Sequence, residues 1–121
     1  MTKCSTYKLG KESEKIALIY LEKNNFSILK QNWRAGRTGE IDIVTRDKST
    51  NELVFTEVKS CASSLDDAKE LVTPQKQKQL VKLAKLYLYL TNSMDLPCRF
   101  DVIAIKINND KKILEHIRNA F

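Results

Sequence analysis

Hydrophobic residues follow a helical spacing in two stretches of the chain. Residues 10–25 place Ala17 and Leu21 on one side of a helix that stops at a pair of asparagines. Residues 74–92 open with Pro74, which is well placed as a first helical residue, and then carry apolar residues every three or four positions. The pattern therefore predicts an early helix and a longer one in the second half of the chain.

Shorter stretches with alternating or β-branched apolar residues predict strands. These stretches are residues 26–33, 40–45, 53–60 and 99–107. Residues 113–117 fit either a short strand or a helix. The predicted order is αβββαβ, an α/β arrangement whose first three strands form a meander, in one domain spanning residues 1–121.

Composition narrows the classes of partner. The 121 residues include 21 basic and 15 acidic side chains, a net charge of +6, which favours polyanions such as nucleic acid. Three cysteines at wide spacings and a single histidine favour neither a disulfide framework nor a structural zinc site. Because no apolar stretch is long enough to cross a bilayer, we expect a cytoplasmic protein with no membrane contact.

Charged residues interrupt the predicted strand at residues 53–60. Alternation places Leu53 and Phe55 on one face together with Glu57 and Lys59. At about 7 Å apart along that face, the two charged side chains could share a phosphate or a water molecule. A solvated strand end is the ordinary explanation of an isolated E-x-K pattern, so this pattern needs support from elsewhere.

Two further carboxylates supply that support. Asp42 lies between Ile41 and Ile43, and we expect it to face away from both and toward the side of Glu57. Glu14 shares the inward side of the first helix with the apolar residues that follow it, although pairing with a neighbouring lysine explains its position equally well. Carboxylate oxygens are the ligands that Mg²⁺ prefers.

Taken in order, these motifs resemble the PD-(D/E)XK nuclease superfamily, and more closely its YraN-like family, which is similar to archaeal Holliday-junction resolvases. The resemblance rests on the segments GKESE, NWRAGRTGEIDIV, LVFTEVKS and RFDVIAI and on the helical pair Lys76 and Gln77, and it covers nearly the whole chain. Related proteins often carry a basic residue two positions after the motif lysine Lys59, where this chain has Cys61.

The resemblance implies a restriction-endonuclease-like αβββαβ core with a mixed central sheet flanked by helices. It implies that Asp42 and Glu57 hold Mg²⁺, with Mn²⁺ as a substitute, that Lys59 positions or activates the attacking water, and that Glu14 supports the site. Lys76 and Gln77 would contact nucleic acid. The expected reaction is hydrolysis of phosphodiester bonds in DNA rather than RNA, at branched or single-stranded structures, by a protein that could act as a homodimer.

Other side chains near these motifs could either contact nucleic acid or have a purely structural position. Arg34 and Arg37 could grip phosphates or be merely solvated, and Trp33 could stack on an unpaired base, although a tryptophan is more often part of the core. A basic stripe, composed of Lys78, Lys82 and Lys85, is usually a solvated helix face unless it continues to the site.

Two predictions concern the C-terminal region. We expect Arg99 to pair with Asp101 and to buttress the fourth strand. His116 receives no catalytic role, since nothing near it in the sequence forms a ligand set or a relay.

Two other functions compete with a nuclease. The chain could be a non-catalytic module that binds nucleic acid within a repair or processing complex, or an interaction protein whose charged motif only stabilises the fold. Dependence on a divalent metal separates these classes, because only the catalyst requires it.

Overall fold

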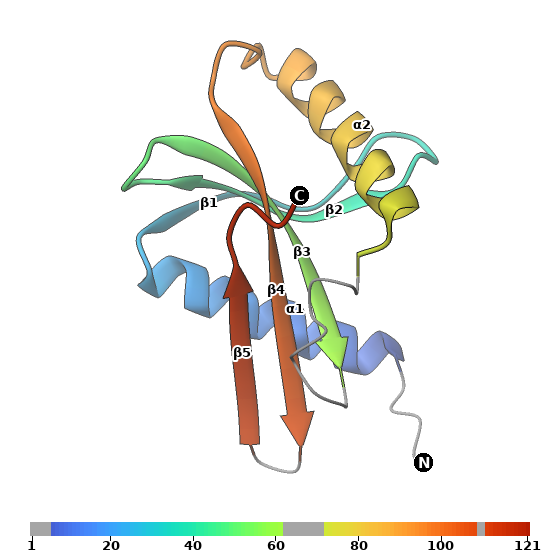
Figure 1. Cartoon of the computed structure of the whole chain (residues 1–121), viewed down its shortest axis with the longest axis vertical. Helices are drawn as coiled ribbons and strands as arrows, with labels where there is room; N and C mark the ends of the chain where they lie inside the picture. Colours follow the sequence, from blue (N-terminus) through green and yellow to red (C-terminus); the bar gives the residue numbers. More distant parts are fainter. Residues whose placement is uncertain (1–5, 62–71, 109–110) are drawn as a thin grey trace.

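The computed structural model describes residues 6–61, 72–108 and 111–121, with the side chains of residues 6–9, 61 and 108 left out. Its elements are α1 (Thr6–Lys23), β1 (Phe26–Arg34), β2 (Glu40–Asp47), β3 (Glu52–Cys61), α2 (Pro74–Leu90), β4 (Cys98–Asn108) and β5 (Lys111–Ile117). The predicted order αβββαβ is confirmed, and the undecided segment at residues 113–117 is a strand (Figure 1).

The five strands form one mixed sheet in the order β1-β2-β3-β4-β5. Strands β3 and β4 are parallel, and the other neighbours are antiparallel. The connection from β3 to β4 contains α2, as a parallel crossover requires. The α/β fold with a mixed sheet flanked by helices is therefore as the sequence predicts.

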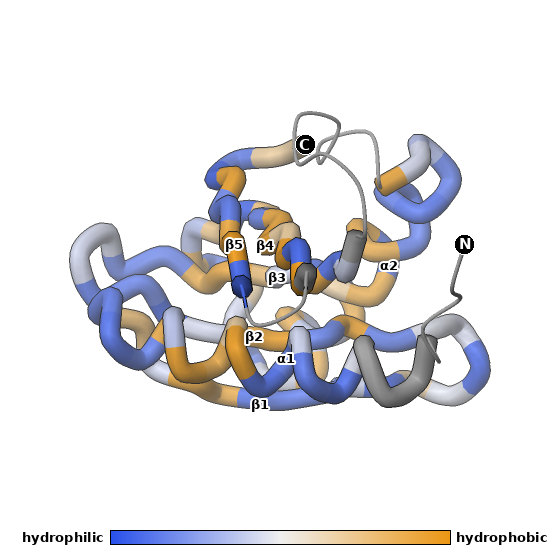
Figure 2. The backbone as a smooth tube through the Cα atoms, turned by 90° about the horizontal axis from the view of Figure 1, so that it is seen from below, coloured by the Kyte–Doolittle hydropathy of each residue, from blue (hydrophilic) through white to orange (hydrophobic). Residues whose placement is uncertain are grey.

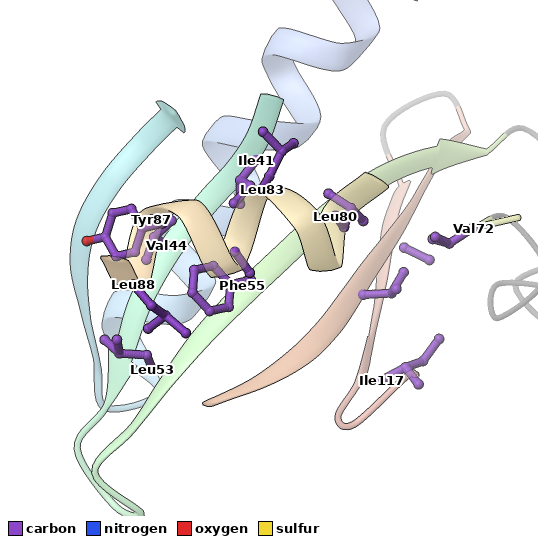
Figure 3. Close-up of a cluster of buried hydrophobic side chains, with 13 residues drawn as sticks. Ile41, Val44, Leu53, Phe55, Val72, Leu80, Leu83, Tyr87, Leu88 and Ile117 are labelled. Atoms are coloured by element: carbon purple, nitrogen blue, oxygen red, sulfur yellow. The ribbon is translucent and has the colours of Figure 1, made fainter. Parts of the chain in front are cut away.

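Each helix covers its own hydrophobic cluster on the sheet. Beneath α2, buried residues of the helix pack on residues of the sheet such as Phe55 and Val44 (Figure 3). Beneath α1, Ala17 and Leu21 pack against a second cluster that includes Val54 and Ile103. Hydrophobic and hydrophilic segments alternate along α1 in Figure 2, as they do in an amphipathic helix. Neither described helix is both long and apolar enough to span a membrane.

The helix ends differ from the predicted ones by a few residues. Helix α1 begins at Thr6, so Gly10 lies inside it and not at its start. Helix α2 begins as expected, because Pro74 takes the first position and the Thr73 hydroxyl accepts the backbone N–H of Lys76. It ends at Leu90 rather than near Asn92, which has a φ of +58° that no α-helix accommodates.

The alternation predicted for β3 is confirmed, but the one predicted for β2 is wrong. Phe55 of β3 packs in the α2 cluster and Val54 in the α1 cluster. In β2, however, Ile41 packs on the α2 side and Ile43 on the α1 side, so the two isoleucines that flank Asp42 do not share a face. Regular pleating fails between them, and this irregularity positions the site described next.

Candidate metal centre

Strands β2 and β3 separate at Asp42. Their paired residues run from Asp47 opposite Glu52 to Ile43 opposite Thr56, and beyond that point β3 continues beside β4 (Figure 1). The backbone N–H of Val58 in β3 donates instead to the Asp42 carboxylate, at 2.8 Å. The Asp42 side chain thus replaces a backbone partner where the sheet opens.

Strand β1 is irregular at the same level. Gln31 pairs with Ile43 and Trp33 with Ile41, so Asn32 lies opposite Asp42. The φ angle of Asn32 is +49°. Asparagine tolerates this left-handed conformation better than most residues do. The conformation places the Asn32 amide among the carboxylates at the opening.

Three carboxylates meet there and form an acidic cluster, defined as Glu14, Glu40 and Asp42. One oxygen from each lies within 4.8 Å of the other two, and all three side chains are partly buried. The Asn32 Nδ2 donates to the Oε1 of Glu14 at 3.0 Å and to the Oε2 of Glu40 at 3.3 Å. A single amide group therefore holds two of the three carboxylates.

Glu57 lies beside the acidic cluster and is paired with lysines. Its side chain is only 5% exposed, and its Oε2 lies 3.4 Å from the Nζ of Lys59 and 3.9 Å from the Nζ of Lys76. The Oε1 is buried and has no hydrogen-bond partner among the residues that the structure describes. An unpartnered buried carboxylate oxygen is costly, so a cation or a proton at this point would relieve it.

The surroundings of Asp42 disfavour its ionised form. Burial is the largest cause that raises its pKa, followed by the nearby charge of Glu57 and then that of Glu14. The hydrogen bond from Val58 acts in the opposite direction, and the net effect raises the pKa of Asp42 to about 8. Several carboxylates in one partly buried place disfavour each other's ionised forms.

The structure brings Glu14 and Asp42 together and places Glu57 next to Asp42, while Lys59 contacts Glu57. Of the two predicted metal ligands, Asp42 belongs to the group of oxygens that lie within 4.8 Å of one another, whereas Glu57 does not; the other members are Glu14 and Glu40. Glu40 was missed as a candidate although it lies two positions before Asp42. That spacing was the signal that could have found it.

The four residues predicted to contact nucleic acid lie in different surroundings. Arg34 is exposed, and its Nε lies 3.0 Å from the Oε1 of Glu40, while Arg37 is exposed in the loop between β1 and β2. Lys76 reaches Glu57, but the Gln77 side chain donates to the carbonyl of Val72 at the start of α2.

A pocket of about 260 Å³ opens beside Lys76. Lys76 lines it together with Thr73, Gln75 and Gln79. The Gln79 side chain donates to the Thr38 carbonyl and thereby joins α2 to the loop between β1 and β2. The pocket therefore adjoins the site at Lys76, whose Nζ lies 3.9 Å from the Oε2 of Glu57.

Trp33 belongs to the core and not to this surface. Its ring makes an edge contact with Tyr87 at a centroid distance of 5.3 Å and packs on the α2 cluster. Cys61 ends β3, but its side chain lies outside the described part of the structure.

A second group of buried charges, here called the Arg99 network, lies elsewhere on the sheet. The predicted Arg99–Asp101 pair is confirmed, with Nε to Oδ1 at 3.0 Å. The guanidinium of Arg99 also reaches Asp47 at 2.9 Å and Glu52 at 2.8 Å. His116 completes the network, with its Nε2 2.7 Å from the Oδ2 of Asp101.

His116, to which the sequence assigns no catalytic role, has partners that are distant in sequence. Its Nδ1 lies 2.9 Å from the hydroxyl of Tyr20, so both ring nitrogens are occupied. These partners are 96 and 15 residues away in sequence, and only the fold brings them together. Burial is the largest cause acting on the Tyr20 hydroxyl and raises its pKa, so the contact does not activate it.

The fold and the site define an α/β protein whose mixed sheet opens at a partly buried acidic cluster beside two lysines. The chain belongs to the family described as "Uncharacterised protein family UPF0102", whose model matches residues 13–105. A UPF0102 protein of Geobacter metallireducens is 43% identical over 114 residues, covering 93% of this chain and 91% of the relative. One of Thermodesulfovibrio yellowstonii is 47% identical over 114 residues, covering 93% and 95%.

Among solved structures, the chain is similar to that of Pyrococcus furiosus SfsA in complex with Ca²⁺. The TM-score is 0.39 and the sequence identity 16%, over 93% of this chain. The chain spans 63% of the length of that protein.

Proposed function

We propose that this protein is a Mg²⁺-dependent endonuclease of the PD-(D/E)XK superfamily that hydrolyses phosphodiester bonds in DNA in the cytoplasm. One observation carries the proposal. Glu57 is buried at the opening of the sheet, next to Asp42 and 3.4 Å from Lys59, and within the described part of the chain its Oε1 has no partner. The lysine contacts are both at Oε2, so among the described residues the Oε1 of Glu57 and the neighbouring carboxylate of Asp42 have no cation.

The residues present fit a hard divalent cation. All the converging donors are carboxylate oxygens, which Mg²⁺ prefers and Mn²⁺ accepts. A cation would also give the Glu57 Oε1 a partner and would offset the repulsion that raises the pKa of Asp42. Asp42 and Glu57 would hold the ion, with Glu14 and Glu40 as additional ligands or as partners of its water shell.

Hydrogen bonds within the chain hold the carboxylates in position for a bound ion. When bound, the ion would supply Lewis acidity toward water and phosphate oxygens. The Val58 N–H fixes the orientation of Asp42, and Asn32 fixes Glu14 and Glu40.

The lysines supply positive charge at the same place. Lys59 and Lys76 both reach the Oε2 of Glu57, so either ammonium can meet the negative charge that grows on a phosphate during attack. Lys59 is the better placed of the two, since it lies closer to Glu57 on the same strand.

The test is a cleavage screen with purified protein. Branched, flapped, single-stranded and duplex DNA would be incubated with Mg²⁺ or Mn²⁺, and cleavage and binding would be measured on the same substrate for the wild type and Lys59→Ala. We expect Lys59→Ala to lose on the order of a hundredfold in rate, because it removes a charge that acts in the transition state, while binding changes only modestly.

Two variants complete the experiment. Lys48→Ala removes an exposed lysine from the turn between β2 and β3 and should cleave like the wild type. Asp42→Ala should lose both metal binding and cleavage. Unchanged cleavage by a folded Lys59→Ala would exclude that lysine from catalysis, and DNA binding by the wild type without metal dependence or cleavage would support the non-catalytic binding module instead.

A further inference from the structure

One flank of α2 runs from the pocket to the end of the helix. Its residues are spaced by four and three positions in turn, which keeps them on one side of an α-helix. They are Gln75, Gln79, Lys82, Leu86 and Tyr89, and we call them the α2 flank. Its first two members line the pocket together with Lys76, so the α2 flank begins next to the lysine that contacts Glu57.

The α2 flank joins positive charge to exposed apolar surface. Lys82 is exposed, as are Lys78 and Lys85 on the adjoining outer side of the helix. The ion pairs formed by the described residues involve none of these three lysines. Further along, Leu86 is 37% exposed and Tyr89 is 71% exposed.

This combination differs from an ordinary solvated helix face. A solvated face is mainly polar, whereas here Tyr89, the most exposed large apolar residue among those the structure describes, follows the lysines at helical spacing. Lysines can follow a phosphate backbone while an exposed aromatic ring offers a surface on which a base can stack.

We propose that the α2 flank binds a single-stranded DNA extension as it leaves the cleavage site, an inference that rests on the proposed nuclease function. The phosphates would follow Lys82 and its neighbouring lysines, and an unpaired base would stack on Tyr89. From Gln75 to Tyr89 the helix rises about 21 Å, which is room for several nucleotides. The substrate class is therefore DNA with a single-stranded branch or end.

Duplex DNA fits the α2 flank less well, because its bases are already stacked on one another and present no free face to Tyr89. A second copy of this chain is the other candidate occupant, since Leu90 at the end of the helix and Met94 shortly after it are also exposed, at 62% and 60%. The exposed lysines beside that surface, which form no ion pair with any described residue, favour a polyanion over a second chain of net charge +6.

The test measures binding separately from cleavage. Fluorescence anisotropy would be recorded without divalent metal for two labelled DNAs, a blunt duplex and the same duplex with a single-stranded extension. We expect Tyr89→Ala to weaken binding of the extended DNA about fivefold or more and to leave the blunt duplex unchanged. Lys82→Gln should lower the slope of log affinity against log salt by about 0.7 for the extended DNA.

Lys23→Gln is the matched control, because it removes one exposed lysine at the end of α1, on the other side of the sheet. It should bind both DNAs like the wild type. Equal losses on both DNAs, or none in Tyr89→Ala, would overturn the proposal, as would conversion of a dimer into a monomer by Tyr89→Ala in analytical ultracentrifugation. Failure of the nuclease function shows separately, as an extended DNA that binds to the α2 flank and is never cleaved with Mg²⁺ or Mn²⁺.

Discussion

Asp42 in β2 and Asp101 in β4 both belong to the central sheet, yet the pKa of Asp42 is raised and that of Asp101 is lowered. Burial would raise the pKa of Asp101, but hydrogen bonds from His116 and Arg99 outweigh it, so the net pKa of Asp101 is lowered. Burial likewise raises the pKa of Asp42, and there the neighbouring charges of Glu57 and Glu14 add to the effect. The two pKa values therefore shift in opposite directions because Asp101 lies beside hydrogen-bond donors and a guanidinium, whereas Asp42 lies beside carboxylates.

The contrast separates a group of buried charges that the fold neutralises from one that it leaves partly unneutralised. In the Arg99 network each carboxylate has a cation or a donor within hydrogen-bond distance, and its members tie β2, β3, β4 and β5 together. In the acidic cluster the carboxylates are held in place by Asn32 and Val58, but their charge is incompletely offset. Carboxylates whose negative charge the protein does not fully offset form a candidate binding site for a cation.

The largest expected effect comes from removing the cation of the Arg99 network. Arg99→Met would leave Asp47 and Asp101 buried without their guanidinium partner, which should lower the free energy of unfolding by about 3–5 kcal/mol. Urea denaturation would measure it. Arg46→Met is the control, since Arg46 makes one exposed hydrogen bond to Asn51; equal losses in both variants would mean that the Arg99 network contributes no special stability.

A smaller effect of opposite sign is expected at Asp42. Its pKa is near 3.9 in an unfolded chain and about 8 in the metal-free fold, so its contribution to stability is fully present below about pH 4 and is lost as the pH rises through 8. Asp42→Asn keeps an oxygen for the Val58 N–H but cannot ionise. We expect it to be more stable than the wild type at pH 9, by at least about 1 kcal/mol, when no divalent metal is present.

Asp101→Asn is the matched comparison for this prediction. Because the pKa of Asp101 is lowered in the fold, its charge stabilises the protein above the unfolded pKa and ceases to do so in acid. Asp101→Asn should therefore be less stable than the wild type at neutral pH. Denaturation curves of both variants that moved in the same direction at pH 9 would contradict the difference between the two aspartates.

The sequence predicts the fold well where local patterns decide it. Helical spacing, the proline at the start of α2 and the alternation in β3 are properties of neighbouring residues, and the structure confirms them. The irregularity at Asp42 was not predictable in this way, because it depends on Asn32 of the neighbouring strand and on the point where β2 leaves β3.

The same distinction applies to the charged residues. Glu57 and Lys59 lie on one strand, so their proximity follows from its period of two. The contacts of His116 with Asp101 and Tyr20 join three elements, and no pattern in the C-terminal segment points to them. Glu40 lies between these cases, since its spacing from Asp42 is local but its approach to Glu14 is made by the fold.

The smallest effect on stability is expected at Arg34, whose pair with Glu40 resembles the Arg99 pairs in distance but not in burial. The Arg34 side chain is 71% exposed, whereas that of Arg99 is 4% exposed. Exposed ion pairs contribute little, because water screens the charges and the side chain loses rotamer freedom, so Arg34→Gln should change the free energy of unfolding by no more than about 0.5 kcal/mol.

The charge of Arg34 remains available to a phosphate, and the salt slope of DNA binding should therefore fall by about one in Arg34→Gln. Urea denaturation and anisotropy titrations on the same Arg34→Gln preparation measure both quantities, with Arg46→Gln as the control for loss of one surface arginine. A loss of stability approaching that of Arg99→Met would place Arg34 with the structural charges and remove it from the DNA-binding surface.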